Sequence, residues 1–180
     1  KELDYSTVKS VFYNRKAAIL FELQAHQEAL IAVKESQRID SIKNYRWRIL
    51  SNYILEGAIY RETNSIDKAI RILKKTLFVA KEQKNVQEYK LALYNIANCF
   101  SQINEYPKAL IFCKKFNEID SFFISINHQG DIAHIQYNAY KTLGITDSAL
   151  FALEQAYSHR LNKMELLTEE NAKANKQAIE

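Results

Sequence analysis

The feature that most constrains this chain is a recurrence at intervals of 40 residues. Ala29, Ala69, Ala109 and Ala149 are separated by equal steps, and an aliphatic residue follows each of them. A period between about 20 and 50 residues is typical of proteins in which one structural unit is stacked on the next. The chain is therefore expected to contain four copies of one unit.

Each copy carries two runs of apolar residues with the spacing of an α-helix. In the second copy, Gly57 and Tyr60 lie one turn apart on a first helix. A polar break follows at Asn64, and Ala69 and Leu73 then lie one turn apart on a second helix. The pattern predicts four helical hairpins. The first-helix stripe recurs as Tyr13, Ala17 and Leu20, as Leu93, Ala97 and Phe100, and as Ala133, Tyr137 and Tyr140.

The small residues in these stripes have a packing role. They let helix axes approach to about 8 to 10 Å, while neighbouring large side chains fill the remaining space. A single hairpin of this kind cannot bury its apolar stripe, so each copy depends on the next. The expected fold is an all-α solenoid, in a domain of residues 1–160 with repeats at about 4–43, 44–83, 84–123 and 124–163.

The end of the sequence differs from the repeats. Residues 161–180 begin with Leu161, Met164, Leu166 and Leu167, but their second half is nearly all polar. This segment is expected either to cap the stack as a fifth first helix or to form a solvent-exposed linker helix.

Composition supports a soluble helical protein. The 180 residues are 47% hydrophobic and 26% charged, which argues against disorder, and only three glycines and one proline are available for tight turns. No apolar run approaches the roughly 20 residues that a membrane helix needs. The two cysteines, Cys99 and Cys113, fall on apolar helix positions and are expected to be buried free thiols.

Two stretches resemble tetratricopeptide repeats (TPRs). The first is the pairing of Gly57 with Tyr60, followed by a break at Asn64 and by Lys68-Ala69-Ile70, and the second is Tyr106-Pro107-Lys108-Ala109-Leu110. The resemblance extends from about Tyr5 to Ala156, and it implies a right-handed solenoid. The usual TPR period is about 34 residues, so the longer period is a departure. HEAT repeats share the longer period and remain an alternative, but the alternation of small and aromatic positions favours TPRs.

Long repeats of this kind resemble those of bacterial signalling and regulatory proteins, including peptide-sensing regulators and the input regions of sensors. The resemblance implies a non-enzymatic scaffold that binds a protein or peptide and needs no cofactor. Its location would be the bacterial cytoplasm or the extracytoplasmic side of a membrane-anchored regulator. The alternatives are a structural spacer or homodimerisation module with no groove ligand, and the regulatory part of a phosphatase-like peptide sensor.

In TPR proteins the first helices line a concave groove, and the residues that flank the packed stripe are the candidate ligand contacts. Carboxamides can pair with both the N–H and the C=O of an extended peptide, and aromatic side chains supply burial. Asparagine is also a poor choice inside a helix unless something uses it. An unoccupied polar face is the alternative. The candidates are Asn14, Phe21, Ile54, Arg61, Tyr94, Asn95, Asn98, Gln102, His134, Asn138 and Lys141.

Other functions find little support in the sequence. The TPR clamp for a C-terminal carboxylate is not reproduced, because the places where it needs polar or basic groups hold Ala18, Leu55, Ala58 and Leu91. Lys34, Lys74 and Lys114 recur on the second helices, but 25 basic against 21 acidic residues is too even a balance for nucleic-acid binding. The sequence has no metal-binding or phosphate-binding motif that would indicate catalysis.

The packing register can be tested at Ala69. An Ala69→Arg substitution should lower the free energy of unfolding by several kcal/mol, since it overpacks a helix crossing and buries a charge. Urea unfolding followed by circular dichroism measures the change, and a neutral result would refute the register.

Overall fold

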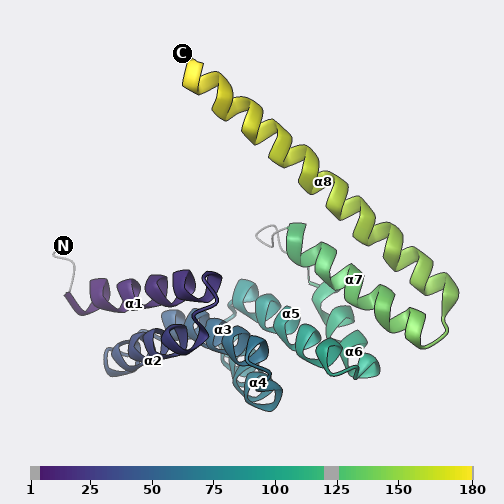
Figure 1. Cartoon of the computed structure of the whole chain (residues 1–180). Coiled ribbons are helices and arrows are strands. Elements are labelled where there is room, and N and C mark those ends of the chain that lie inside the picture. The colour runs from purple at the N-terminus through teal and green to yellow at the C-terminus, as the bar shows by residue number, and fades with distance from the viewer. Residues whose placement is uncertain (1–4, 120–125, 180) are drawn as a thin grey trace. The chain divides into compact units, whose positions relative to one another are not determined.

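In a computed structural model, which describes residues 5–119 and 126–179, the chain is helical throughout the described parts. The prediction of an all-α fold of consecutive helical hairpins is confirmed (Figure 1). The eight helices of these parts are α1 (Tyr5–Glu22), α2 (His26–Ile42), α3 (Arg46–Glu62), α4 (Ile66–Glu82), α5 (Val86–Gln102), α6 (Tyr106–Asn117), α7 (Ile126–Thr142) and α8 (Thr146–Ile179).

The chain forms two compact units, residues 1–99 and 100–180, and the boundary falls within α5. In the first unit, α1 packs on α2, α3 packs on α4, and α3 also contacts α2 and α1. In the second unit, α7 packs on both α6 and α8. The expected division at residue 160 stays a prediction, and the expected boundary at 123–124 lies outside the described residues.

The same turn joins successive helices, and it recurs every 20 residues from Gln24 to Asn104. The last residue of each turn has a left-handed backbone, with φ between 54° and 60° at Gln24, Asn44, Asn64, Lys84 and Asn104, and 73° at Gly144. The next N–H donates back to a carbonyl five residues earlier, as from Tyr45 to Asp40 at 2.8 Å and from Ser65 to Tyr60 at 2.7 Å. These are the bonds of the Schellman helix end, which satisfies carbonyls that the helix leaves open.

The 40-residue repeat therefore consists of two halves of equal length, and each half is a helix followed by the same turn. The sequence analysis did not predict this equality. The apolar pattern indicates the break at Asn64 within the second hairpin, but it does not indicate the identical turns between hairpins. Asparagine tolerates the left-handed region better than most residues, so Asn44, Asn64 and Asn104 at equivalent positions were the available signal.

The small residues lie at the helix crossings, as the sequence predicts. Ala29, Ala69 and Ala109 are completely buried, and so are Ala17 and Ala97 on the first helices. At the crossing of α3 and α4, a Cβ built on Gly57 would lie 2.6 Å from Leu73 Cγ. These two helices therefore approach more closely than any side chain at residue 57 would allow.

The C-terminal segment continues α8 rather than forming a separate helix. The helix extends from Thr146 through Ile179, and every described side chain from 161 to 174 is exposed. The predicted C-terminal helix is thus an extension of the second helix of the fourth hairpin.

Both cysteine predictions are confirmed, because Cys99 and Cys113 are free and buried. Burial raises the pKa of Cys99 to about 11 and that of Cys113 to about 12, so both thiols stay protonated near neutral pH. Within the described residues, no helix has the length and apolar character needed to cross a membrane.

Two glycines make a matched test of the close approach. Gly57→Ala should destabilise the protein by about 1 to 3 kcal/mol, because the new methyl overlaps Leu73. Gly130→Ala, also within a helix, should instead stabilise it by about 0.5 to 1 kcal/mol, since its Cβ would meet His159 Cβ at an ordinary 3.4 Å. Urea unfolding midpoints measure both, and equal effects would contradict the close crossing.

Candidate functional site

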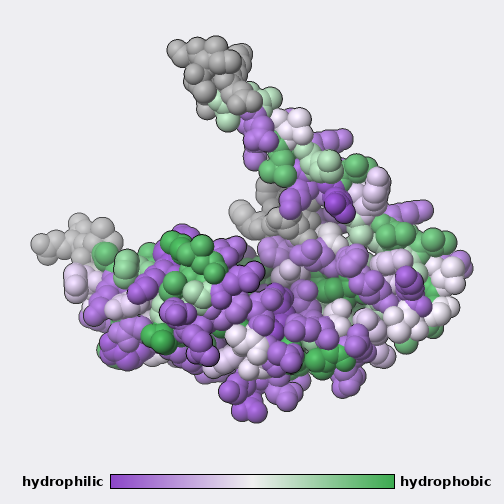
Figure 2. Space-filling view, in the orientation of Figure 1, coloured by the Kyte–Doolittle hydropathy of each residue, from purple (hydrophilic) through white to green (hydrophobic). Residues whose placement is uncertain are grey.

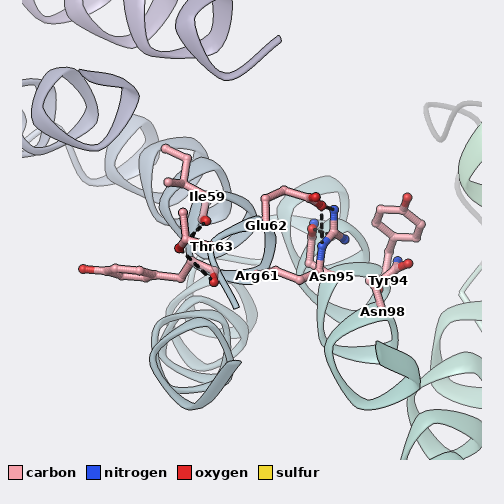
Figure 3. Close-up of polar contacts among 8 residues, drawn as sticks. Ile59, Arg61, Glu62, Thr63, Tyr94, Asn95 and Asn98 are labelled. Atoms are coloured by element: carbon pink, nitrogen blue, oxygen red, sulfur yellow. Dashed lines mark hydrogen bonds and ion pairs between the residues drawn. The ribbon is translucent and has the colours of Figure 1, made fainter. Parts of the chain in front are cut away.

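Polar side chains join neighbouring first helices of the first unit. Arg61, at the end of α3, reaches across to α5, where its Nη1 lies 3.5 Å from Asn95 Oδ1 (Figure 3). Its Nη2 is 2.7 Å from Glu62 Oε1, and only 16% of the Arg61 side chain is exposed. The guanidinium is therefore held in place between an acid on its own helix and an amide on α5.

Two further candidates, Tyr94 and Asn98, lie beside Asn95 on α5 (Figure 3). The Asn95 amide donates to the Leu91 carbonyl at 2.9 Å, and the Asn98 amide donates to the Tyr94 carbonyl at 3.0 Å. Asn95 is buried, whereas Tyr94 and Asn98 are half-buried. These local bonds fix the two amide groups on the helix.

Among the candidate residues nearest the N-terminus, Asn14 is hydrogen-bonded to buried polar side chains. Asn14 on α1 donates to Asn52 Oδ1 on α3 at 2.7 Å. Asn52 in turn donates to Asp40 Oδ2 on α2 at 2.8 Å, so three helices are joined by one chain of hydrogen bonds. Phe21 packs on the apolar core of the first hairpin, and Ile54 is half-buried on α3.

Asp40 is the centre of a buried polar cluster that sequence analysis did not single out. Its other carboxylate oxygen accepts a hydrogen bond from Ser10 Oγ, and Ser36 Oγ donates to the Ser10 carbonyl at 3.0 Å. Burial raises the pKa of Asp40 above its ordinary value, although the hydrogen bond from Ser10 and the charge of Arg48 oppose that rise.

A hollow of about 260 Å³ adjoins this cluster, and Trp47 and Arg48 form part of its wall. The Arg48 guanidinium lies 4.8 Å from the ring centres of both Tyr45 and Trp47. Arg48 also donates to the Thr7 carbonyl at 3.4 Å. The cation thus stays close to Asp40 while its flat faces pack on aromatic rings.

A second buried acid, Glu56, links α2 to α3. It accepts from Gln37 Nε2 at 2.6 Å and forms an ion pair with Lys34. Lys34 is one of the three recurring lysines, so this member of the predicted basic ridge is bound to an acid on the neighbouring helix.

The remaining candidates lie in the second unit. Asn138 Nδ2 is 3.4 Å from His134 Nδ1, and Lys141 Nζ lies 5.6 Å from the Tyr137 ring centre. Gln102 is exposed near the end of α5. His134 also lines a hollow of about 680 Å³ between α7 and α8, together with Gly130, Asp131, Leu153, Ala156, Tyr157, His159, Arg160 and Lys163.

The structure thus brings Arg61, Tyr94, Asn95 and Asn98 together on one face of the first unit, and His134 and Asn138 together on α7. Their role in binding stays a prediction. Across the described parts of the chain, no group of three or more His, Cys, Asp or Glu residues gathers in a way that could hold a metal ion.

Neither a protein-family model nor a curated protein matches the sequence. Solved structures do match. BtubC (BKLC) from P. vanneervenii is 10% identical, with a TM-score of 0.76 over 91% of this chain and 67% of that chain. A kinesin-light-chain structure from Podosopora anserina, with nearly identical TPR-like repeats, is 13% identical, with a TM-score of 0.64 over 89% and 80% of the two chains.

Because the sequences are only 10% and 13% identical, the structural similarity shows the fold alone. It confirms the predicted TPR-like repeat architecture.

The buried acid predicts a pH dependence of stability. Because the pKa of Asp40 is raised in the folded state, its contribution to stability is present below the unfolded pKa of about 4 and is lost as the pH rises through the folded pKa. The free energy of unfolding of the wild type minus that of Asp40→Asn should therefore be smaller at about pH 7 than at about pH 4.

Urea unfolding of both proteins across this range measures the difference. Any change that Asn makes to the hydrogen bonds adds a constant offset, which cancels when the two pH values are compared. A difference that does not vary with pH would refute the raised pKa.

Proposed function

We propose that this protein is a non-enzymatic scaffold that binds an extended peptide or protein segment along the first-helix face of α1, α3 and α5. The observation that carries the proposal is the group formed by Arg61, Tyr94, Asn95 and Asn98. These residues combine a held cation on α3 with a half-buried aromatic ring and two carboxamide groups on α5.

The chemistry of this group suits a peptide backbone. A guanidinium and a carboxamide can donate to peptide carbonyls, while the Asn98 oxygen can accept from a peptide N–H. The tyrosine ring offers apolar area at a small cost in conformational entropy. Because Arg61 and Asn95 are already held by their neighbours, less freedom is lost when a ligand binds.

The proposal extends to the larger context that the TPR resemblance implies. In this view the chain is the input or interaction part of a bacterial regulatory protein, and the bound peptide or protein is its signal. The full-length gene product tests this part: an output domain joined to the chain would support it, and its absence would contradict it.

Selection from a random-sequence peptide library displayed on phage tests the binding face. Peptides enriched on the immobilised wild type should bind an Arg61→Ala/Asn98→Ala variant at least about tenfold more weakly, because both substitutions remove direct contacts. Thermal unfolding of both proteins is measured in parallel, because Arg61 is mostly buried and bonds to Glu62 and Asn95, and affinities are compared at a temperature where the variant is fully folded. Fluorescence anisotropy of labelled peptides measures the affinities.

The matched control is Arg71→Ala, which removes an exposed arginine from α4, a second helix. It should leave the affinities unchanged. Equal binding by the first-helix variant and the wild type would contradict the proposed face, and failure to enrich any peptide would favour the structural-spacer alternative.

A further inference from the structure

The repeat makes it possible to compare each side chain with its counterparts in the other hairpins. Phe12 and Ile19 on α1 are 60% and 61% exposed. Their counterparts are all at most 1% exposed, namely Asn52, Ala92 and Ile132 for Phe12, and Ile59, Cys99 and Ala139 for Ile19. One face of α1 is therefore open at positions that are buried in every other copy, and large apolar residues occupy it.

The second helix of the fourth hairpin has the complementary property. Leu153 on α8 is 41% exposed, whereas its counterparts Val33, Leu73 and Cys113 are completely buried. Tyr157, one turn further, is 63% exposed, whereas its counterpart Gln37 is buried and Leu77 is half-buried; the third counterpart, Asn117, is exposed. Figure 2 shows hydrophobic surface over α1 and along α8.

The interior of the chain shows what covers such faces. The second helix of one hairpin packs on the first helix of the next, as α2 does on α3 and α6 does on α7. Gln37 donates to Glu56 at 2.6 Å in the first of these interfaces. The equivalent residues of the second, Asn117 and Gln136, form the same type of contact at 3.4 Å. One mode of packing therefore recurs.

We propose that copies of this chain associate head to tail, with α1 of one copy packed on α8 of another in the way that α3 packs on α2. The open face of α1 is a first-helix face, and the open face of α8 is a second-helix face. They are thus the two halves of the interface that the chain already forms internally. Such a contact is heterologous, so it leads to rings or open chains.

The charges of the two faces agree with this pairing. In the interior interface, Lys34 on α2 forms an ion pair with Glu56 on α3. The equivalent positions on the open faces hold Glu154 on α8 and Lys16 on α1. The two charges are exchanged, and the pair remains attractive. Tyr157 lies one turn after Glu154 on α8, and the pairing places it opposite Lys16. A cation–π contact between them would replace the hydrogen bond that Gln37 donates to Glu56.

Complementation between variants tests the proposal. An α1 variant, Phe12→Glu/Ile19→Glu, and an α8 variant, Leu153→Glu/Tyr157→Glu, each keep one intact face. The wild type should associate in a concentration-dependent way in analytical ultracentrifugation, and each variant alone should associate at least about tenfold more weakly. An equimolar mixture should form a heterodimer that grows no further, because only one matched pair of faces remains.

The control is Phe78→Glu on α4. Phe78 is 68% exposed, and its counterparts Arg38, Glu118 and Ser158 are exposed as well, so it lies on neither face. This variant should assemble like the wild type. A wild type that stays monomeric at every concentration, or a mixture of variants that does not dimerise, would overturn the proposal. Continued dimerisation of the α8 variant alone would also overturn it, since that would indicate symmetric pairing through α1.

A charge exchange tests the register within the same experiment. Glu154→Lys and Lys16→Glu should each weaken association by about two- to fivefold, since each places like charges opposite one another at the surface. Combining both substitutions in one chain should restore it. Failure of the combination to restore association would refute the pairing of these positions.

Discussion

The left-handed turn after each helix is the constraint on which the rest of the structure depends. It recurs every 20 residues from Gln24 to Asn104 and again at Gly144, and it ends each helix at the same point of the repeat. Because all helices between two described turns then have the same length, the small residues of successive hairpins stay in register. Within the second hairpin, the turn at Asn64 brings Gly57 to face Leu73 at a distance that excludes even a methyl group.

The period of 40 residues exceeds the usual TPR length of about 34 residues. The extra residues lengthen both helices and leave the turns unchanged, so each first helix has an additional stretch of surface. Arg61 lies near the end of α3 and contacts α5 there. The candidate binding face thus includes the C-terminal end of a first helix.

The fold could be predicted from the sequence because its signals are local and are repeated. Small residues at equal spacing and apolar stripes with helical period each occur within one hairpin, and four copies made them distinct. The cluster around Asp40 could not be predicted in this way, because Ser10, Asp40 and Asn52 come from three helices and this combination of residues occurs in one copy only. A signal did exist: Asp40 stands where the next copy has the buried Ala80.

The difference between the first interface and the later ones follows from this cluster. Between α2 and α3, buried Asp40, Asn52 and Glu56 are satisfied by specific partners, whereas the positions of Asn52 and Glu56 are taken by Ala92 and Ile96 on α5. Apolar faces of similar shape can be exchanged for one another at little cost. A buried polar group cannot, because each bond left unmade costs about 1 to 3 kcal/mol. The polar first interface therefore favours one neighbour for the first hairpin, among hairpins that are otherwise alike.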